Sequence, residues 1–354
     1  MAESINIAVE KIEESRINSI DFSNLPFGKF QSDHMFEMDY VNGEWTDLKI
    51  VPYHNLTFPP TLSTLHYGQS VFEGLKAYRT VKNEIKLFRP EMHAARINHS
   101  ARRMCMPEVP ENIFLEALHK LIQIDQDWVP QDSDSSLYVR PFLFATDEAL
   151  GVTPSQTYKF IIFTCPVGAY YAEPVKVKVE TEFTRAAQGG TGNVKAAGNY
   201  SASLLPAKKA LAEGYHQILW TDGKEHKYIE EAGTMNIMFQ IGDTIVTPEL
   251  TSSILGGITR KSVIALAKEW GVKIEERRIS VDELIVASKA GLLKDAFGTG
   301  TAVTIHHIIS ITKDGVDMIL PPVEEREFSN KAKQYLKDLK IGTADDYMNW
   351  MVNL

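Results

Sequence analysis

The segment Cys165-Pro166-Val167-Gly168 limits how this chain can fold more than any other. Proline lacks a backbone N–H and glycine weakens regular structure, so we expect the apolar run before this segment to end there. A new pattern, in which apolar and charged residues alternate, starts after Pro174. The 354 residues are enough for about two domains. We therefore predict a smaller N-terminal α/β domain at 1–166, a linker at 167–173 and a larger domain at 174–354.

Periodic patterns predict strands and helices in both halves. Residues 39–52 should form a hairpin around Asn42-Gly43, because this dipeptide favours a two-residue turn. Amphipathic patterns predict helices at 91–106 and 111–128, and Ser280-Val281-Asp282-Glu283 is a capping box that should open another. The first of these helices is expected to bury Ala95, Ile97, Ala101 and Met104. Further strands are expected at 136–146, 159–165, 175–182, 216–220, 235–246 and 295–311, and helices at 201–214, 259–270 and 324–339.

Charge and composition exclude several classes of protein. The chain has 46 acidic and 37 basic residues, and this acidic balance without a basic run disfavours nucleic acid and anionic membranes as partners. It has neither a run of about 18 apolar residues nor a signal peptide, so we expect a cytoplasmic protein. The two cysteines, Cys105 and Cys165, should be reduced and mostly buried. No metal site is expected, because the adjacent His306-His307 would point to opposite faces of a strand.

Three glycine-bearing turns in the second half could carry chemistry. The first, GGTGNVKAAGNY at 189–200, surrounds Lys195 with small residues, and a lysine away from water can act as a nucleophile. The same segment also fits a flexible surface loop, and it lacks the pattern of a nucleotide-binding loop. The second, Leu255–Arg260, precedes a helix whose first N–H groups can bind phosphate, or in which Thr259 is only the helix cap. The third, Gly298–Ala302, fits an anion-binding nest or a tight strand turn.

Taken together, these turns and other strings resemble the branched-chain amino acid aminotransferases of the fold-type IV pyridoxal 5'-phosphate (PLP) group. The resemblance runs from about Phe27 to Met351 and implies a two-domain α+β/α/β chain with the D-amino acid aminotransferase-like fold. It also implies PLP in the cleft between the domains, and a homodimer. The strings occur in the family's order: FG at 27–28, SDHM at 32–35, LHYG at 65–68, FEGLKA at 72–77, LFRP at 87–90, YVRP at 138–141, CPVGAY at 165–170, the lysine turn, EAGTMN at 231–236, and the GGITR and GTGTA turns.

The resemblance implies roles for individual residues. Lys195 matches the lysine that holds PLP as a Schiff base, Glu231 the carboxylate facing the pyridine nitrogen, and Tyr200 the tyrosine bonded to the phenolic oxygen. From the residues alone, Arg96 is one of several helix arginines, and Phe72 and Met235 equally fit an ordinary core. The implied phosphate ligands are Arg96, Ile258, Thr259 and Thr301, with Arg185 near the cofactor; carboxylates are handled by Tyr67, Arg140, Thr234 and Ala302, and apolar walls are supplied by Phe27, Phe72, Tyr138, Tyr170 and Met235.

The implied activity is that of a branched-chain-amino-acid transaminase. It would move an amino group reversibly from L-leucine, L-isoleucine or L-valine to 2-oxoglutarate. Another fold-type IV enzyme, a D-amino acid aminotransferase or an aminodeoxychorismate lyase, would share the fold and the cofactor residues. The strings YVRP at 138–141 and CPVGAY at 165–170 favour the branched-chain reading. The intact set of Lys195, Tyr200 and Glu231 disfavours a PLP-binding protein without catalytic activity.

Overall fold

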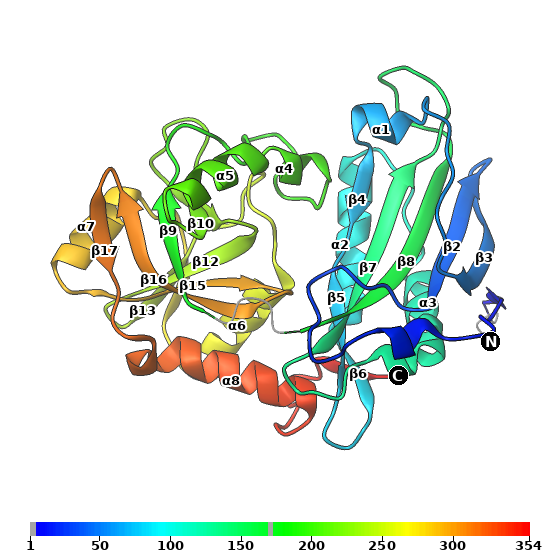
Figure 1. Cartoon of the computed structure of the whole chain (residues 1–354). Helices are drawn as coiled ribbons and strands as arrows, with labels where there is room; N and C mark the ends of the chain where they lie inside the picture. The colour runs from blue at the N-terminus through cyan, green and yellow to red at the C-terminus, as the bar shows by residue number, and fades with distance from the viewer. Residues whose placement is uncertain (1–4, 169–172) are drawn as a thin grey trace. The chain divides into compact units, whose positions relative to one another are not determined.

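The computed structural model describes residues 5–168 and 173–354, which form two compact units (Figure 1). The first contains the described residues of Met1–Tyr170 together with Lys195–Ala197 and Asp338–Leu354, and the second contains those of Tyr171–Val194 and Gly198–Lys337. The predicted linker includes residues outside the described chain, so its boundaries stay a prediction. Within residues 5–168 and 173–354, no helix is long and apolar enough to cross a membrane.

The first unit is a mixed sheet with helices packed against it. Its strand order is β1-β3-β2-β8-β7-β5-β6-β18, and β4 pairs with β7. In chain order its elements are β1 (Ala8–Val9), the 3-10 helix η1 (Arg16–Ser19), β2 (His34–Val41), β3 (Glu44–Pro52), α1 (Ser63–Tyr67), β4 (Ser70–Phe72), β5 (Leu75–Arg79), β6 (Ile85–Phe88), α2 (Pro90–Arg103), α3 (Glu111–Ile124), the 3-10 helix η2 (Gln126–Trp128), β7 (Ser136–Ala145), β8 (Tyr158–Val167) and β18 (Met351–Asn353).

The expected hairpin and the first two helices are confirmed. Strands β2 and β3 pair antiparallel, and the turn between them has Asn42 at φ 54° and Gly43 at φ 89°. Helix α2 ends at Arg103 and α3 at Ile124, each a few residues before the predicted end. The prediction that Ala95 is buried was wrong. Ala95 is exposed, because the face of α2 that packs on the sheet carries Ala94, Ile97 and Ala101.

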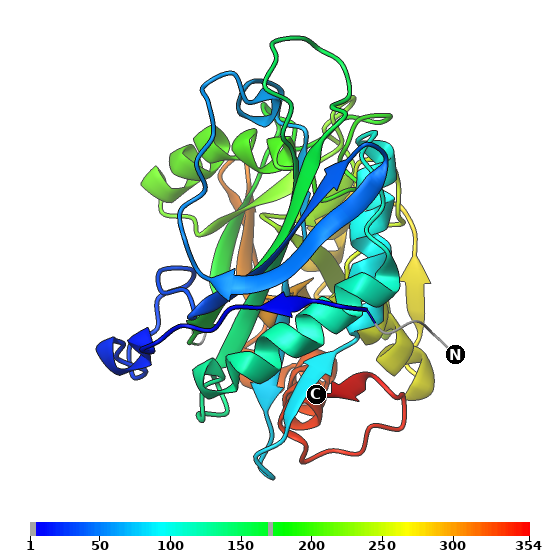
Figure 2. The ribbon, with the colours of Figure 1, turned by 90° about the vertical axis from the view of Figure 1, so that its right-hand side faces the viewer.

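The pleat of the sheet separates core side chains from those of the opposite face. Helices α2 and α3 lie against one face (Figures 1 and 2), and Val71, Leu75, Leu137 and Val139 belong to the core formed there. Successive side chains of a strand point to opposite faces. The intervening residues of the paired strands β4, β5 and β7 therefore lie on the face away from the helices; they include Phe72, Lys76, Tyr138 and Arg140.

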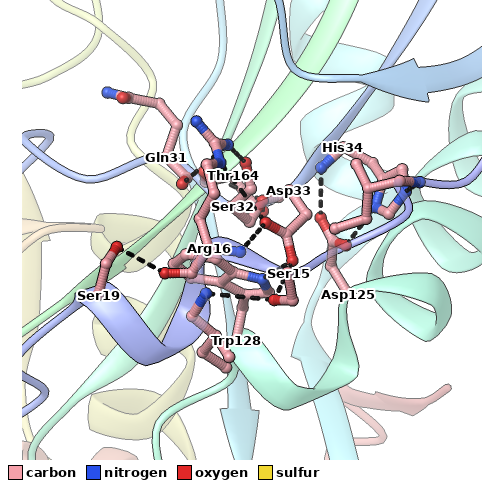
Figure 3. Close-up of polar contacts among 12 residues, drawn as sticks. Ser15, Arg16, Ser19, Gln31, Ser32, Asp33, His34, Asp125, Trp128 and Thr164 are labelled. Atoms are coloured by element: carbon pink, nitrogen blue, oxygen red, sulfur yellow. Dashed lines mark hydrogen bonds and ion pairs between the residues drawn. The ribbon is translucent and has the colours of Figure 1, made fainter.

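Asp33 ties the segment before β2 to the first unit (Figure 3). Its Oδ2 accepts hydrogen bonds from Ser15 Oγ at 2.5 Å and Trp128 Nε1 at 2.8 Å, and its Oδ1 accepts from the Arg16 N–H at 3.0 Å. Burial acts to raise the pKa of Asp33, but these donors outweigh it and the pKa is lowered. The SDHM string at 32–35 thus contributes a charged anchor for the N-terminal segment.

The second unit is built around a closed barrel. Six strands form a ring in the order β11-β10-β9-β16-β15-β12, because β11 also pairs with β12, and closure removes exposed sheet edges. Its elements are β9 (Val175–Val179), α4 (Gly198–Ser201), α5 (Leu204–Ala212), β10 (Gln217–Thr221), β11 (Ile229–Ala232), β12 (Met235–Ile241), β13 (Thr244–Thr247), α6 (Ile258–Glu269), β14 (Ile274–Glu276), α7 (Val281–Lys289), β15 (Leu293–Gly300), β16 (Thr304–Lys313), β17 (Val316–Ile319) and the 3-10 helix η3 (Val323–Glu325); helix α8 (Glu327–Ile341) follows.

Most predicted elements of the second half are present, but two of the predicted strands are hairpins. The segment 235–246 is β12 and β13, separated by a turn with Gly242 at φ 58°. The segment 295–311 is likewise divided between β15 and β16. The alternation of apolar and charged residues correctly located β9, although this strand ends at Val179.

Replacing Ser280 with Ala should lower the free energy of unfolding by about 1 kcal/mol. Ser280 caps α7, since its Oγ accepts a hydrogen bond from the Glu283 N–H at 3.0 Å. The capping box is only half formed, because the Glu283 carboxylate pairs with Arg277 instead. Urea unfolding would measure the loss. Ser288→Ala, within the same helix, is the matched control and should change stability by less than about 0.5 kcal/mol. Equal stability of Ser280→Ala and wild type would contradict the prediction.

Both cysteines are free thiols. Cys165 is buried, and its burial raises the pKa of the thiol to about 11. Cys105 is exposed, so the prediction that the cysteines are mostly buried was wrong for it. It lies just beyond the end of α2 at φ 53°, where the chain turns out of the helix.

Candidate active site

The peptide of Lys195 is fixed within the first unit. Its N–H donates to Ser100 Oγ at 3.1 Å, and its carbonyl accepts from the Phe72 N–H at 3.1 Å. The next residue, Ala196, forms a β-bridge with Val71. The Nζ atom of Lys195 lies 4.5 Å from the centre of the Phe72 ring. Lys195 is therefore held by strand β4 and helix α2, and the alternative of a flexible surface loop was wrong.

Arg96 is paired with a buried carboxylate. Its Nε lies 2.6 Å from Glu73 Oε1 and its Nη2 lies 2.9 Å from Glu73 Oε2. The Arg96 side chain is 11% exposed, and that of Glu73 is fully buried. Arg96 is thus distinguished from the exposed arginines Arg102 and Arg103 on the same helix.

An aromatic and cationic group lies on the face of the first sheet that points away from the helices. Arg140 Nη2 donates to Tyr138 Oη at 3.0 Å, and the Arg140 guanidinium lies 4.5 Å from the centre of the Phe72 ring. Phe27 packs edge-on against Tyr138, with ring centres 4.9 Å apart. The buried Nε of Arg140 has no hydrogen-bond partner among the described residues. The group places an apolar surface beside a cation that can form an ion pair with a carboxylate.

Tyr67 is the last residue of α1 and is 43% exposed, and no hydrogen bond or ion pair of its side chain to the group around Arg140 is seen among the described residues. Tyr170 lies outside the described residues.

In the second unit, the Glu231 carboxylate is held by hydrogen bonds and an ion pair. Its Oε1 accepts from the Leu255 N–H at 2.8 Å and from Asn236 Nδ2 at 3.3 Å, and its Oε2 lies 3.2 Å from Arg185 Nε. Glu231 and Asn236 face each other across the β11–β12 hairpin, in which Gly233 has φ 57°. A side chain at Gly233 would also overlap Gln217. The EAGTMN string is therefore a tight hairpin that aims a carboxylate and an amide in one direction.

Four expected site residues line one cavity of the second unit. These are Arg185, Tyr200, Glu231 and Thr234. The neighbouring acid Glu230 lines a different cavity and bonds to Ser253 Oγ, because adjacent residues of β11 point to opposite faces. Burial raises the pKa of Glu230 despite the hydrogen bond from Ser253. The two consecutive carboxylates thus line different cavities.

The second glycine turn leads into α6. Gly257 is the residue before the helix, and Thr259 is its second residue, so the alternative that Thr259 is the cap was wrong. The first intrahelical hydrogen bond runs from Lys261 to Gly257, which leaves the N–H groups of Ile258 and Thr259 outside the helical ladder. A side chain at Gly257 would collide with Asn236 Oδ1, so glycine is required where this loop meets the hairpin. The start of the helix has the chemistry of an anion site.

The third glycine turn is a hairpin. Gly300 pairs with Thr304, and residues 301–303 form the loop, so Thr301 and Ala302 are both loop residues. Met235 packs against Gly298, where a Cβ would lie 2.7 Å from the Met235 methyl carbon. The tight strand turn is therefore present, and any anion binding would come from groups on its loop.

Sequence reasoning gave no role to Glu73, Ser100 or Asn236. Asn236 joins two of the recognised strings, since its Nδ2 donates to the Leu255 carbonyl at 2.7 Å as well as to Glu231. Glu73 could have been found from the sequence, because it is an acid within the apolar run Val71-Phe72-Glu73-Gly74-Leu75 and a buried acid needs a partner. Ser100 had no such signal, because its hydrogen bond to the Arg96 carbonyl is an ordinary local one, and the bond from the Lys195 N–H depends on where the chain returns at residue 195.

Comparison with known proteins identifies the family. The family model described as "Amino-transferase class IV" matches residues 70–311. The chain is 47% identical over 334 residues to branched-chain-amino-acid aminotransferase 2 of Bacillus subtilis (strain 168), covering 93% of this chain and 92% of that one. The branched-chain amino acid aminotransferase structure from Escherichia coli is 27% identical with a TM-score of 0.70, covering 90% and 98% of the two chains. The branched-chain amino acid aminotransferase of Thermobaculum terrenum, solved in its PLP-form, is 24% identical with a TM-score of 0.72, covering 91% and 98%. These likenesses confirm the two-domain fold-type IV architecture. The chain belongs to the class IV aminotransferases and, among them, to the branched-chain-amino-acid aminotransferase family.

Proposed function

We propose that this chain moves an amino group reversibly between L-leucine, L-isoleucine or L-valine and 2-oxoglutarate, with PLP as cofactor. The products are the branched-chain 2-oxo acids and L-glutamate. The observation that carries the proposal is the 47% identity to a branched-chain-amino-acid aminotransferase over 93% of the chain. The D-amino acid and lyase alternatives lack such support, because the eight curated relatives compared, at 40–47% identity, all have branched-chain names.

The residues of both units fit PLP. When bound, PLP supplies an electron sink that stabilises negative charge at the α-carbon of the amino acid. Lys195 offers the primary amine to which the aldehyde attaches, and Glu231 offers a carboxylate of fixed direction for the pyridine nitrogen. Arg96 and the N–H groups of Ile258 and Thr259 offer donors to the phosphate. Tyr200 for the phenolic oxygen, and Thr301 and Arg185 near the cofactor, complete the proposed set.

The groups around Arg140 are proposed to select the substrate. Phe27, Phe72 and Tyr138 give an apolar surface for the branched side chain, while Arg140 pairs with the distal carboxylate of glutamate or 2-oxoglutarate. One methylene in an apolar pocket changes binding by only about 1–3 kcal/mol, so leucine, isoleucine and valine should all react. Tyr67, Tyr170, Thr234 and Ala302 remain proposed contacts of the substrate carboxylates or side chain, and Met235 a proposed wall.

Lys195 has a second proposed task once the substrate amine has replaced it. Its freed Nζ would remove the proton from the α-carbon of the amino acid. It would then return the proton to the carbon that was the aldehyde carbon of the cofactor. The backbone hydrogen bonds to Ser100 and Phe72 keep the start of the side chain in place, while the flexible methylene stem lets Nζ move.

Borohydride reduction followed by peptide mapping tests the proposal. The reduced cofactor should be found on the peptide that contains Lys195. The experiment can discriminate, because two other buried lysines have amines that are easily neutralised: burial lowers the pKa of Lys76 to about 8 and that of Lys340 to about 7. Label on Lys76 or Lys340, or no label at all, would overturn the assignment. Formation of L-glutamate from L-leucine and 2-oxoglutarate would then establish the substrates.

We also propose that the chain acts as a homodimer in the cytoplasm. Two free cysteines are consistent with a reducing compartment. Helix α5 exposes the apolar side chains of Leu204, Leu205 and Leu211, which a second copy would cover. Light scattering of the purified protein should give twice the mass of one chain, and a monomer at micromolar concentration would contradict the dimer.

A further inference from the structure

Glu73 is a carboxylate with four donors and no exposed surface. Its Oε1 accepts from Arg96 Nε at 2.6 Å, and its Oε2 accepts from Arg96 Nη2 at 2.9 Å and from the Gly74 N–H at 3.1 Å. His93 Nδ1 lies 2.7 Å from Oε2. His93 and Arg96 are three residues apart on α2, so both reach the same acid from one helix face.

Charge and burial indicate that this cluster contains one anion, Glu73, and one cation, Arg96. Burial acts to raise the pKa of Glu73, but the Arg96 guanidinium and the hydrogen bond with His93 outweigh it and hold the pKa well below its usual range. Burial lowers the pKa of His93, which therefore donates as a neutral imidazole near pH 7. The charge of Glu73 is thus matched by Arg96 rather than by His93.

We propose that Glu73 is the positioning residue that sets the plane and direction of the Arg96 guanidinium for the phosphate of the cofactor. Two parallel hydrogen bonds fix the plane of a guanidinium, whereas a single bond would let it rotate. The inference rests on the proposed function, because the phosphate role of Arg96 belongs to it. Glu73 would not touch the cofactor but would act through Arg96.

The acid is itself held by the backbone that fixes Lys195. The Glu73 N–H donates to the Pro141 carbonyl at 2.8 Å, and the preceding residue Phe72 donates to the Lys195 carbonyl at 3.1 Å. Ser100 makes a second connection, since its Oγ donates to the Arg96 carbonyl at 3.1 Å and accepts from the Lys195 N–H. The proposed attachment point and the proposed phosphate ligand therefore share one rigid support.

The test compares the binding of PLP with that of pyridoxal, which has the aldehyde but no phosphate. Full-length chains freed of cofactor are titrated with each compound, for wild type, Glu73→Gln, Arg96→Ala and the double variant. Glu91→Gln is the matched control, because it removes one charge from the exposed first turn of α2. We expect Glu73→Gln to raise the Kd of PLP by at least about tenfold and that of pyridoxal by less than about twofold. The double variant should bind PLP no more weakly than Arg96→Ala.

Several outcomes overturn the inference. Glu73→Gln with a Kd of PLP near wild type would do so, and so would equal losses for PLP and pyridoxal, which indicate general structural support. If Arg96→Ala shows no preferential loss of PLP, the inference fails while the attachment to Lys195 still stands. A wild-type chain that binds neither compound would instead refute the proposed function. Should Glu73→Gln fail to fold, Glu73→Asp decides: its carboxylate is one methylene too short for both bonds, so an unchanged preference for PLP would count against Glu73.

Discussion

Glu231→Gln is expected to lower kcat by about two to three orders of magnitude while leaving PLP attached to Lys195. The amide oxygen of Gln can still accept from the Leu255 N–H, which Glu231 Oε1 does now at 2.8 Å. The amide carries no negative charge, however, and cannot keep the pyridine nitrogen of the proposed cofactor protonated. The electron sink would then be weak, although the cofactor remains in place.

Glu230→Gln is the matched control for this prediction. It changes the same atoms one residue earlier on β11, but its side chain lines a different cavity and bonds to Ser253. Its kcat with L-leucine and 2-oxoglutarate should stay within about threefold of wild type. Borohydride reduction of both variants would confirm that the cofactor is retained. A Glu231→Gln enzyme as active as wild type, or two variants with equal losses, would remove Glu231 from its proposed role.

Glu231→Gln should also destabilise the second unit. The Arg185 side chain is 9% exposed, and its guanidinium would lose the carboxylate that lies 3.2 Å from Nε. A buried cation without its partner costs about 3–5 kcal/mol. Two carbonyls, those of Gly192 and Ser253, still accept from Arg185 Nη2 and limit this loss. Kinetics should therefore be measured well below the unfolding temperature, so that lost turnover is not confused with unfolded enzyme.

Local sequence patterns were sufficient to predict the structure where residues that are neighbours in the chain determine it. Asn42-Gly43 favours one turn, and β2 and β3 are paired around it. Ser280 caps its helix because the donor is only three residues away. Ala95 was misplaced because helical spacing shows that a stripe is buried, but an error of one residue rotates that stripe by about 100°. The sheet decides the rotation through contacts that periodicity does not contain.

The site depended on contacts between residues far apart in the chain. Glu73 and Arg96 lie 23 residues apart, and Ser100 bonds to the peptide of Lys195 across 95 residues. Such pairs follow from strand order and loop path, which no short window of sequence determines. The family resemblance named Arg96 and Glu231, but neither their partners nor the direction of their side chains followed from it. The hydrogen-bond and ion-pair partners of Arg96 and Glu231 therefore became known only from the structure.

Arg140 should distinguish the two kinds of substrate that one pocket has to accept. Its guanidinium lies 4.5 Å from the centre of the Phe72 ring and 5.4 Å from that of Tyr138, so its stem and plane complete the apolar surface. Its Nη2 donates to Tyr138 Oη, and its buried Nε has no hydrogen-bond partner among the residues that the structure describes. A carboxylate can use such a donor, whereas a branched alkyl group can only pack against the cluster.

Arg140→Met is therefore expected to reduce kcat/KM for 2-oxoglutarate by about tenfold to 150-fold, the equivalent of roughly 1.5–3 kcal/mol for hydrogen bonds to a charged group. The value for L-leucine should fall by less than about threefold, because methionine keeps an unbranched apolar stem over Phe72. The two half-reactions can be measured separately by single-turnover kinetics, so each substrate reports its own interaction with the enzyme. Tyr138→Phe is the companion variant, since it leaves the ring and removes the hydroxyl that accepts from Arg140. If Arg140→Met reduces both values equally, Arg140 shapes the pocket without recognising the distal carboxylate, and that carboxylate must be bound by another group.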